Sequence, residues 1–201
     1  DEYISTCEKA LKIESTLELK SPYYEGLLIN SIDAYIFKGG EDQKVQELLQ
    51  ELYDCEECRP ESYVLYTKYL GTKDLESTDS QAIFNQFNVS GLLEFCVYVN
   101  DVGAKTLNSN DLSQLQIATA KTLSKHEFYK EAMDYNEEAL ELTRNIYSKD
   151  LANSLANYKS SQALKEKDLI IEYKDERNNL YIIIATLIGG LLFIMILAYS
   201  K

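Results

Sequence analysis

The sequence predicts an all-α protein that ends in one membrane-spanning helix, and three observations support this fold class. Apolar residues recur at helical spacing along most of the 201 residues. Segment 104–188 contains neither proline nor glycine, and segment 180–199 contains no charged residue. We therefore expect stacked helical hairpins over 1–160, a charged juxtamembrane helix over 161–179 and a transmembrane helix over 180–200.

Glycine and proline divide the first half of the chain into short segments. Between these breaks, apolar residues lie three or four positions apart, as on one face of a helix. The predicted faces consist of Leu27, Leu28, Ser31, Ile32 and Tyr35; of Val45, Leu48, Leu49 and Leu52; and of Tyr63, Leu65, Tyr66 and Tyr69. Segment 97–102 is rich in β-branched residues but has no partner strand nearby, so we expect it to end a helix that begins near Ser90.

The second half predicts further helices of about 14 to 18 residues, joined by short turns. The first of these helices is expected to have Asn110 as its N-cap. The successive apolar faces consist of Leu112, Leu115, Ala118 and Leu123; of Tyr129, Ala132, Met133, Ala139, Leu140 and Ile146; and of Leu151, Leu155 and Tyr158. Helices of this length with short joints are typical of stacked helical hairpins.

One stretch, HEFYKEAMDYNEEALEL, resembles the core of a tetratricopeptide repeat. Tyr129 stands at the repeat's aromatic position, and Ala132 and Ala139 stand at its two small-residue positions. Leu140 matches the leucine that follows the second small residue. Glu127 stands where the repeat usually has glycine, and Asn136 stands where it usually has an aromatic residue. A second stretch, LLINSIDAYIFKGGEDQKVQELLQEL, looks like a more degenerate copy. The resemblance implies that the four matching residues pack paired helices together.

The order of the segments resembles that of membrane sensor proteins of Bacteroidetes-type bacteria. In those proteins, tetratricopeptide-like repeats lead through a charged helix into one span, as LANSLANYKSSQALKEKDLIIEYKDERNNLYIII does here. A histidine kinase or a DNA-binding regulator then follows on the cytoplasmic side. No such domain follows Lys201, so we expect either a cut chain or a stand-alone relative. The resemblance implies a periplasmic module, single-pass in the inner membrane, that binds a protein or peptide and relays binding through the span.

The predicted span meets the length that a bilayer requires, about 20 apolar residues. Tyr181 and Tyr199 lie at its two ends, where amphipathic rings favour the membrane interface. Gly189 and Gly190 lie near its middle and could let a second copy approach closely. A homodimer is therefore one expectation, and a plain anchor is the other.

The orientation in the membrane distinguishes two hypotheses for the function of these helices. Five cations precede the span, namely Lys159, Lys165, Lys167, Lys174 and Arg177. The positive-inside rule applied to them favours a tail-anchored adaptor or import receptor that faces the cytosol. The resemblance favours the periplasmic sensor, which we take as the leading reading. A structural subunit of a membrane complex is a third reading.

Composition and motifs argue against catalysis and nucleic-acid binding. The net charge is −13, whereas phosphate binding needs clustered Lys and Arg. No nucleophile motif, P-loop or zinc-protease motif occurs, so we expect neither an enzyme nor a cofactor. The acidic neighbours of Cys55 and Cys58 disfavour a reactive thiolate. This pair is a candidate for a local disulfide, with free cysteines as the alternative. The other metal-binding types, Cys7, Cys96 and His126, are too scattered to favour a zinc site.

Tyrosine is unusually frequent, with 16 residues, and tryptophan is absent. Most of these rings are expected to fill the helical core. On a concave helical surface, exposed tyrosines could instead hold a peptide through ring faces and hydroxyls. The candidates for exposed, peptide-binding tyrosines are Tyr23, Tyr24, Tyr63 and Tyr66.

Overall fold

The structure is a computed structural model that describes the backbone of residues 2–17 and 21–199, with side chains up to Gln162 and at scattered positions as far as Asn179. It divides into two compact units, Asp1–Tyr147 and Ser148–Lys201. The described helices are α1 (Glu2–Glu14), α2 (Tyr24–Lys38), α3 (Asp42–Asp54), α4 (Arg59–Leu70), α5 (Thr78–Gln86), α6 (Leu92–Thr106), α7 (Ser109–Lys125) and α8 (Tyr129–Tyr199). The described residues form no strand, which confirms the all-α prediction.

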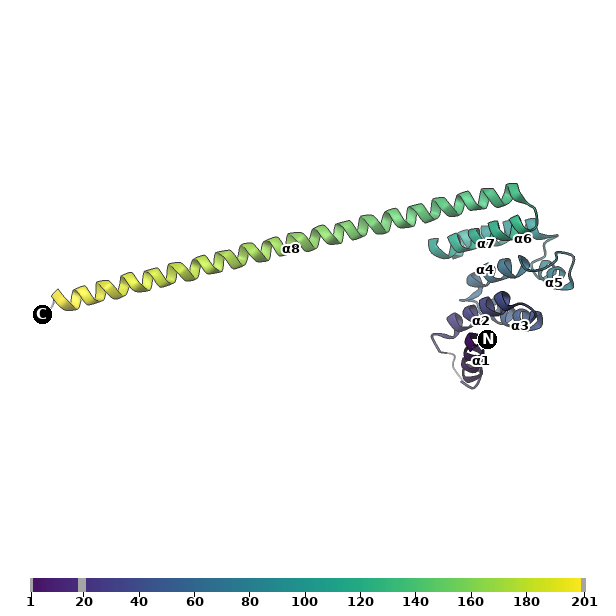
Figure 1. Cartoon of the computed structure of the whole chain (residues 1–201), viewed down its shortest axis with the longest axis horizontal. Coiled ribbons are helices and arrows are strands. Elements are labelled where there is room, and N and C mark those ends of the chain that lie inside the picture. Colours follow the sequence, from purple (N-terminus) through teal and green to yellow (C-terminus); the bar gives the residue numbers. More distant parts are fainter. Residues whose placement is uncertain (1, 18–20, 200–201) are drawn as a thin grey trace. The chain divides into compact units, whose positions relative to one another are not determined.

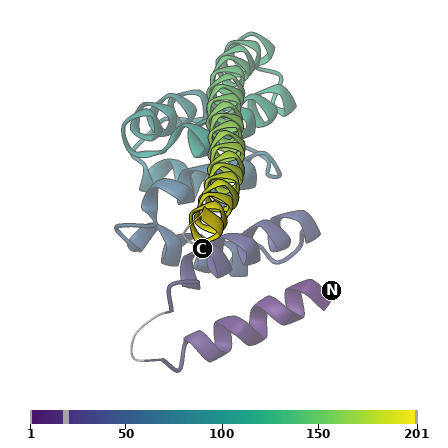
Figure 2. The same cartoon turned by 90° about the vertical axis from the view of Figure 1, so that its left-hand side faces the viewer.

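In the first unit, α2 and α3 lie side by side in one layer, α4 lies in the next, and α6 and α7 lie in the one after (Figure 1). α1 packs on α2, α2 on α3, and α3 on α4, while α6 packs on α7. Figure 2 shows these layers from another side, with α1, in purple, as the outermost helix of the unit. α4 contacts α2, α3, α6 and α7, so it is the central helix of the unit.

α4 is buried on nearly all sides, as its central place requires. Its buried residues are Ser62, Tyr63, Leu65, Tyr66, Thr67, Tyr69 and Leu70. Beside it, Phe87 follows α5 and contacts a cluster of rings from α3, α4 and α6. The ring centroids of Phe87 and Phe95 are 5.1 Å apart, and those of Phe87 and Tyr66 are 5.2 Å apart. The same ring contacts Tyr53 and Tyr63 edge-on, so Phe87 connects the layers around α4.

The start of α7 differs by two residues from the prediction. Asn108, rather than Asn110, is the N-cap, because its backbone is extended and its side chain accepts the N–H groups of Asn110 and Asp111 at 2.9 and 3.1 Å. The predicted helix in segment 97–102 is confirmed, since the segment lies within α6.

α8 is one continuous helix of 71 residues, where short joints were predicted. The absence of glycine and proline from 129–188 removes the residues that would end a helix within it. The boundary between the two compact units falls after Tyr147, within α8, whereas the sequence predicts the end of the helical domain at residue 160.

The predicted span 180–200 falls on side chains that lie outside the described part of the chain. In the part that is described, no helix has the length and apolar character needed to cross a membrane. The predicted juxtamembrane segment 161–179 is helical throughout as part of α8. The span and the tetratricopeptide-like repeats stay predictions.

The turn between α7 and α8 contains a non-glycine residue with left-handed backbone geometry. Glu127 has a φ of 68°. This conformation costs an L-residue about 1–2 kcal/mol, whereas glycine adopts it readily. The position at which a tetratricopeptide repeat usually has glycine therefore has the backbone conformation that glycine favours.

Candidate binding cleft

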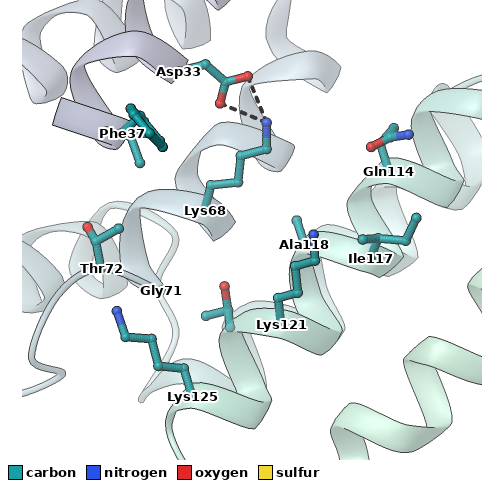
Figure 3. Close-up of a pocket in the computed structure, with 12 residues that line it drawn as sticks. Asp33, Phe37, Lys68, Gly71, Thr72, Gln114, Ile117, Ala118, Lys121 and Lys125 are labelled. Atoms are coloured by element: carbon teal, nitrogen blue, oxygen red, sulfur yellow. Dashed lines mark hydrogen bonds and ion pairs between the residues drawn. The ribbon is translucent and has the colours of Figure 1, made fainter. Parts of the chain in front are cut away.

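Three helices of the first unit line a cleft of about 670 Å³ (Figure 3). The lining residues come from α2 (Asp33, Ile36 and Phe37), from α4 and the turn after it (Lys68, Gly71 and Thr72), and from α7 (Gln114, Ile117, Ala118, Lys121, Thr122 and Lys125). These residues are three or four positions apart on α7, so they lie on one face of that helix. We call this site the lysine cleft.

Apolar side chains make up one part of the lysine cleft. Phe37 lies one residue before the end of α2 and is 94 % exposed. Ile36 and Ile117 are half-buried beside the same cleft. A single exposed aromatic residue is ordinary, but one at the rim of an apolar cleft adds to a surface that another molecule can cover.

Charged side chains make up the other part. Lys68 is already neutralised, because its Nζ lies 2.7 and 2.8 Å from the two carboxylate oxygens of Asp33. Lys121 and Lys125 are exposed and form no ion pair with any described residue. Both also line a neighbouring hollow of about 550 Å³ between α7 and the start of α8. In a chain of net charge −13, two lysines one helical turn apart, neither with a described ion-pair partner, give this face a local positive charge.

The floor of the cleft is a close contact between α4 and α7. Thr122 donates its hydroxyl to the backbone carbonyl of Thr67 at 2.9 Å, and Nε2 of His126 lies 3.1 Å from the carbonyl of Leu70. Both carbonyls also accept a backbone N–H, from Gly71 and Lys73 respectively, so the α7 side chains add second hydrogen bonds that hold α7 against the end of α4. At Gly71, an added Cβ would lie 2.6 Å from the Thr122 hydroxyl oxygen, so the absence of a side chain permits the contact. His126, the single histidine of the sequence, is thus the C-cap of α7 and contacts the end of α4.

A second hollow, of about 170 Å³, adjoins the lysine cleft. It shares Asp33, Lys68 and Gln114 with that cleft, and it also contains Glu61 and Asp111, so we call it the acidic hollow. Glu61 Oε2 is buried and has no hydrogen-bond partner among the described residues. Burial raises the pKa of Glu61. A hydrogen bond from its own backbone N–H opposes this shift, and the nearby carboxylates of Glu25 and Asp111 add to it. A cation placed in this hollow would stabilise the ionised form of Glu61.

The four candidate tyrosines are separated by the structure. Tyr23 is 82 % exposed and Tyr24 is half-buried, with its hydroxyl bonded to Glu51. Tyr63 and Tyr66 are only 4 % and 3 % exposed, so their predicted exposure is wrong. They belong to α4, which other helices surround. None of the four lines the lysine cleft.

The cleft residues that sequence reasoning missed are Phe37, Lys121 and Lys125. Phe37 lies next to the apolar face of α2, and no local pattern distinguishes it from a core residue. Lys121 and Lys125 lie one turn apart and follow Ala118 on the same face, a pattern that a solvated helix surface also shows. Only the packing of α2 on α4, and of α4 on α7, makes them parts of one cleft.

The four residues of the repeat resemblance fall on two sides of α8. Ala132 and Ala139 are buried, and the adjacent part of the helix bonds to α7 through Gln116 and Glu138 at 2.9 Å. Tyr129 and Leu140 are 64 % and 57 % exposed, so these side chains do not fill the core as the resemblance implied. They lie about a quarter turn away from the alanines, given 100° per residue in a helix.

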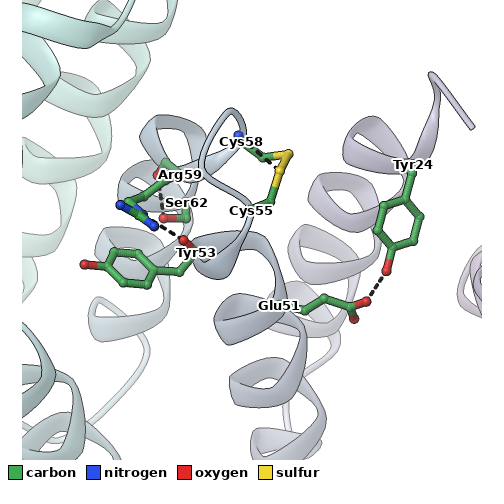
Figure 4. The surroundings of a disulfide bond; sticks show 7 residues. All are labelled: Tyr24, Glu51, Tyr53, Cys55, Cys58, Arg59 and Ser62. Atoms are coloured by element: carbon green, nitrogen blue, oxygen red, sulfur yellow. Dashed lines mark hydrogen bonds between the residues drawn. A yellow bond between two sulfur atoms is a disulfide. The ribbon is translucent and has the colours of Figure 1, made fainter. Parts of the chain in front are cut away.

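The structure joins Cys55 and Cys58 in a disulfide, with their Cα atoms 5.2 Å apart (Figure 4). The pair spans the turn between α3 and α4, with Cys55 as the C-cap of α3 and Cys58 as the N-cap of α4. Arg59 holds the turn by donating Nε–H to the carbonyl of Tyr53 at 2.8 Å. The turn is thus fixed by a covalent bond and by a hydrogen bond across it.

The two remaining cysteines, Cys7 and Cys96, are free and buried. Burial raises the pKa of the Cys96 thiol to about 12, which keeps it protonated at neutral pH. Among the described residues, no three side chains of His, Cys, Asp or Glu are grouped to hold a metal ion.

No protein-family model, curated protein or solved structure matches the chain. The chemistry of the lysine cleft is therefore the basis on which a function can be assigned. The cleft offers apolar contact through Phe37 and Ile117, and positive charge through Lys121 and Lys125. This combination suits a ligand that has both apolar and acidic groups.

Proposed function

We propose that this chain is a membrane-anchored helical module that binds a peptide, or a segment of another protein, in the lysine cleft. The observation that carries the proposal is the cleft itself, where the exposed ring of Phe37 lies near the unpaired Lys121 and Lys125. Its volume of about 670 Å³ is within the range of ligand sites, about 300–1,000 Å³. An apolar surface beside uncompensated charge is suited to a partner of complementary chemistry.

The proposal includes a relay of the bound state towards the membrane. α7 lines the cleft and also bonds to the first turns of α8, through Ser113 and Thr143 at 3.0 Å and through Gln116 and Glu138. A ligand that binds one arrangement of α7 better than another would shift the population of these contacts. Further along α8 lie the juxtamembrane segment and the predicted span. The resemblance to sensor proteins supports an output domain on the cytoplasmic side.

We also propose that the first unit lies in the bacterial periplasm, with the span in the inner membrane. The disulfide between Cys55 and Cys58 supports this side, since such bonds persist in oxidising compartments. A tail-anchored adaptor facing the cytosol would keep both thiols reduced. Membrane sidedness therefore separates the sensor from its rival.

Sidedness can be measured in bacterial spheroplasts that carry the full chain with Cys7→Ser and Cys96→Ser. We expect added protease to digest the first unit, and we expect an impermeant maleimide to label the remaining cysteines only after reduction. With Cys58→Ser added, the unpaired Cys55 should react at once, which controls for access. Protection from protease, with labelling only after lysis, would support the cytosolic adaptor and contradict the sensor.

Binding can be tested with random octapeptides displayed on phage and selected on the full chain in lipid nanodiscs. We expect enriched sequences whose affinity falls about tenfold or more in Phe37→Ser, because an aromatic side chain that a partner covers often contributes about 2 kcal/mol. Gln114→Trp, which fills the cleft from an exposed position on α7, should weaken binding similarly.

The matched control is Tyr23→Ser, which removes an exposed ring just before the opposite end of α2. Its affinity for the selected peptides should stay within about twofold of the unmodified chain, the range of ordinary surface substitutions. If Tyr23→Ser weakened binding and Phe37→Ser did not, the binding site would lie at Tyr23 and the lysine cleft would lose its assigned role.

A further inference from the structure

The lysine cleft and the acidic hollow form one groove along α7, because they share Asp33, Lys68 and Gln114. On α7 the groove extends from Asp111 to Lys125, which are 14 positions apart. At 1.5 Å per residue, this is a length of about 21 Å. An extended peptide, at about 3.3 Å per residue, would cover it with about six residues.

Charges of opposite sign are sorted to the two ends of this groove. Glu61 and Asp111 lie in the acidic hollow, while Lys121 and Lys125 lie in the lysine cleft. The ion pair of Asp33 and Lys68 lies in the part that both hollows share and is already neutral as a pair.

Each of the three helices contributes to this order. α2 passes from Ile29 in the acidic hollow to Phe37 in the lysine cleft, and α4 passes from Glu61 towards Thr72 just beyond its end. α7 runs in the same sense from Asp111 to Lys125. The charge separation therefore follows the length of the groove rather than its width.

We infer that the groove recognises an extended segment of another protein in which a basic and an acidic side chain flank an apolar centre. The basic side chain would lie beside Glu61 and Asp111, and the acidic one beside Lys121 and Lys125. The apolar centre would contact Ile117 and the ring of Phe37. This inference rests on the proposed function and specifies the class of peptide that the site takes.

The unsatisfied groups of the groove explain why both charges are needed. Glu61 Oε2 is buried and accepts no hydrogen bond from any described residue, and an ammonium or guanidinium group would supply a donor. A carboxylate at the other end would pair with two lysines that have no described ion-pair partner. A wholly acidic peptide would place a carboxylate beside Glu61, and a wholly basic peptide would place a cation beside Lys121, so the groove discriminates against both.

The test repeats the selection of random octapeptides on the full chain in nanodiscs and reads the order of charges. From the unmodified chain we expect enriched sequences with Lys or Arg on one side of an apolar centre and Asp or Glu on the other. With Lys121→Glu and Lys125→Glu combined, the enriched sequences should have basic residues on both sides. Peptides selected by the unmodified chain should bind this variant about tenfold more weakly or worse.

The matched control reverses two exposed lysines of α1, with Lys9→Glu and Lys12→Glu combined. It changes the net charge by the same amount but leaves the groove intact, so its selected sequences should match those of the unmodified chain. Equal thermal transitions by circular dichroism would show that both double variants fold.

The outcomes distinguish this inference from the function on which it rests. Enriched sequences with no order of charges, or the same change of sequences in the control variant, would overturn the inference and leave peptide binding in place. If the unmodified chain enriched no sequence at all, peptide binding in the groove would be refuted, and the inference with it.

Discussion

Phe87→Ala is expected to lower the free energy of unfolding by about 3–5 kcal/mol, the loss typical of a large aromatic residue removed from a core. Phe87 is only 7 % exposed, and its ring meets those of Tyr53, Tyr63, Tyr66, Phe95 and Tyr98. Its removal would leave a cavity where α3, α4 and α6 converge. Urea unfolding of the full chain in detergent micelles, followed by circular dichroism, measures the change.

Phe37→Ala is the matched control, since it removes the same side chain from a position that is 94 % exposed. Its free energy of unfolding should change by less than about 0.5 kcal/mol. Phe87→Ala should therefore lower the free energy of unfolding, whereas Phe37→Ala should weaken peptide binding and leave the free energy of unfolding nearly unchanged. If both variants were equally stable, the cluster around Phe87 would not be the centre of the core.

Gly71→Ala is expected to destabilise the protein by about 1–3 kcal/mol, the usual range for overpacking. The added Cβ would lie 2.6 Å from Thr122 Oγ1 and 3.2 Å from the carbonyl oxygen of Lys68. The backbone at Gly71 is right-handed, with a φ of −62°, so the clash rather than the conformation causes the loss. Thermal unfolding measured by circular dichroism should show a lower melting temperature.

Gly26→Ala provides the opposite case within the same protein. Gly26 lies in α2, and an added Cβ there meets no atom within 4 Å. Replacing a helical glycine by alanine favours the helix by up to about 1 kcal/mol, so this variant should melt at a higher temperature. A raised melting temperature for both variants would contradict the close contact between α4 and α7 at Gly71.

Local patterns were enough to predict α2, α3, α4, α6 and α7, whereas no face was assigned to α1 or α5. The turn between α2 and α3 contains Gly39 and Gly40, whose φ angles of 73° and 81° favour glycine, and the sequence shows it as a Gly-Gly pair. The apolar face of α3 is also as predicted, because Val45, Leu48, Leu49 and Leu52 are all buried. Backbone geometry and the 3.6-residue period act within a few residues of the chain, so one sequence reveals them.

Features that depend on the number of neighbours of a helix were not predicted. The sequence shows one apolar face on α4, but α4 contacts four other helices, so Tyr63 and Tyr66 are buried where exposure was expected. The lysine cleft escaped prediction for the same reason. Phe37 and Lys121 are 84 positions apart in the sequence. No local pattern predicts that their two helices line the same groove.

The three helices that line the groove belong to three successive layers of the first unit, and this has a consequence for how a bound peptide could be sensed. α2 packs on α4 and α4 packs on α7, so one occupant of the groove would touch all three helices and restrain any motion between them. The bound state would then differ from the free state in stiffness as well as in position. Because α7 bonds directly to the first turns of α8, a peptide that stiffened the stack would, under the proposed function, also restrain the start of α8. The conformational entropy lost in this way would lower the affinity for the peptide.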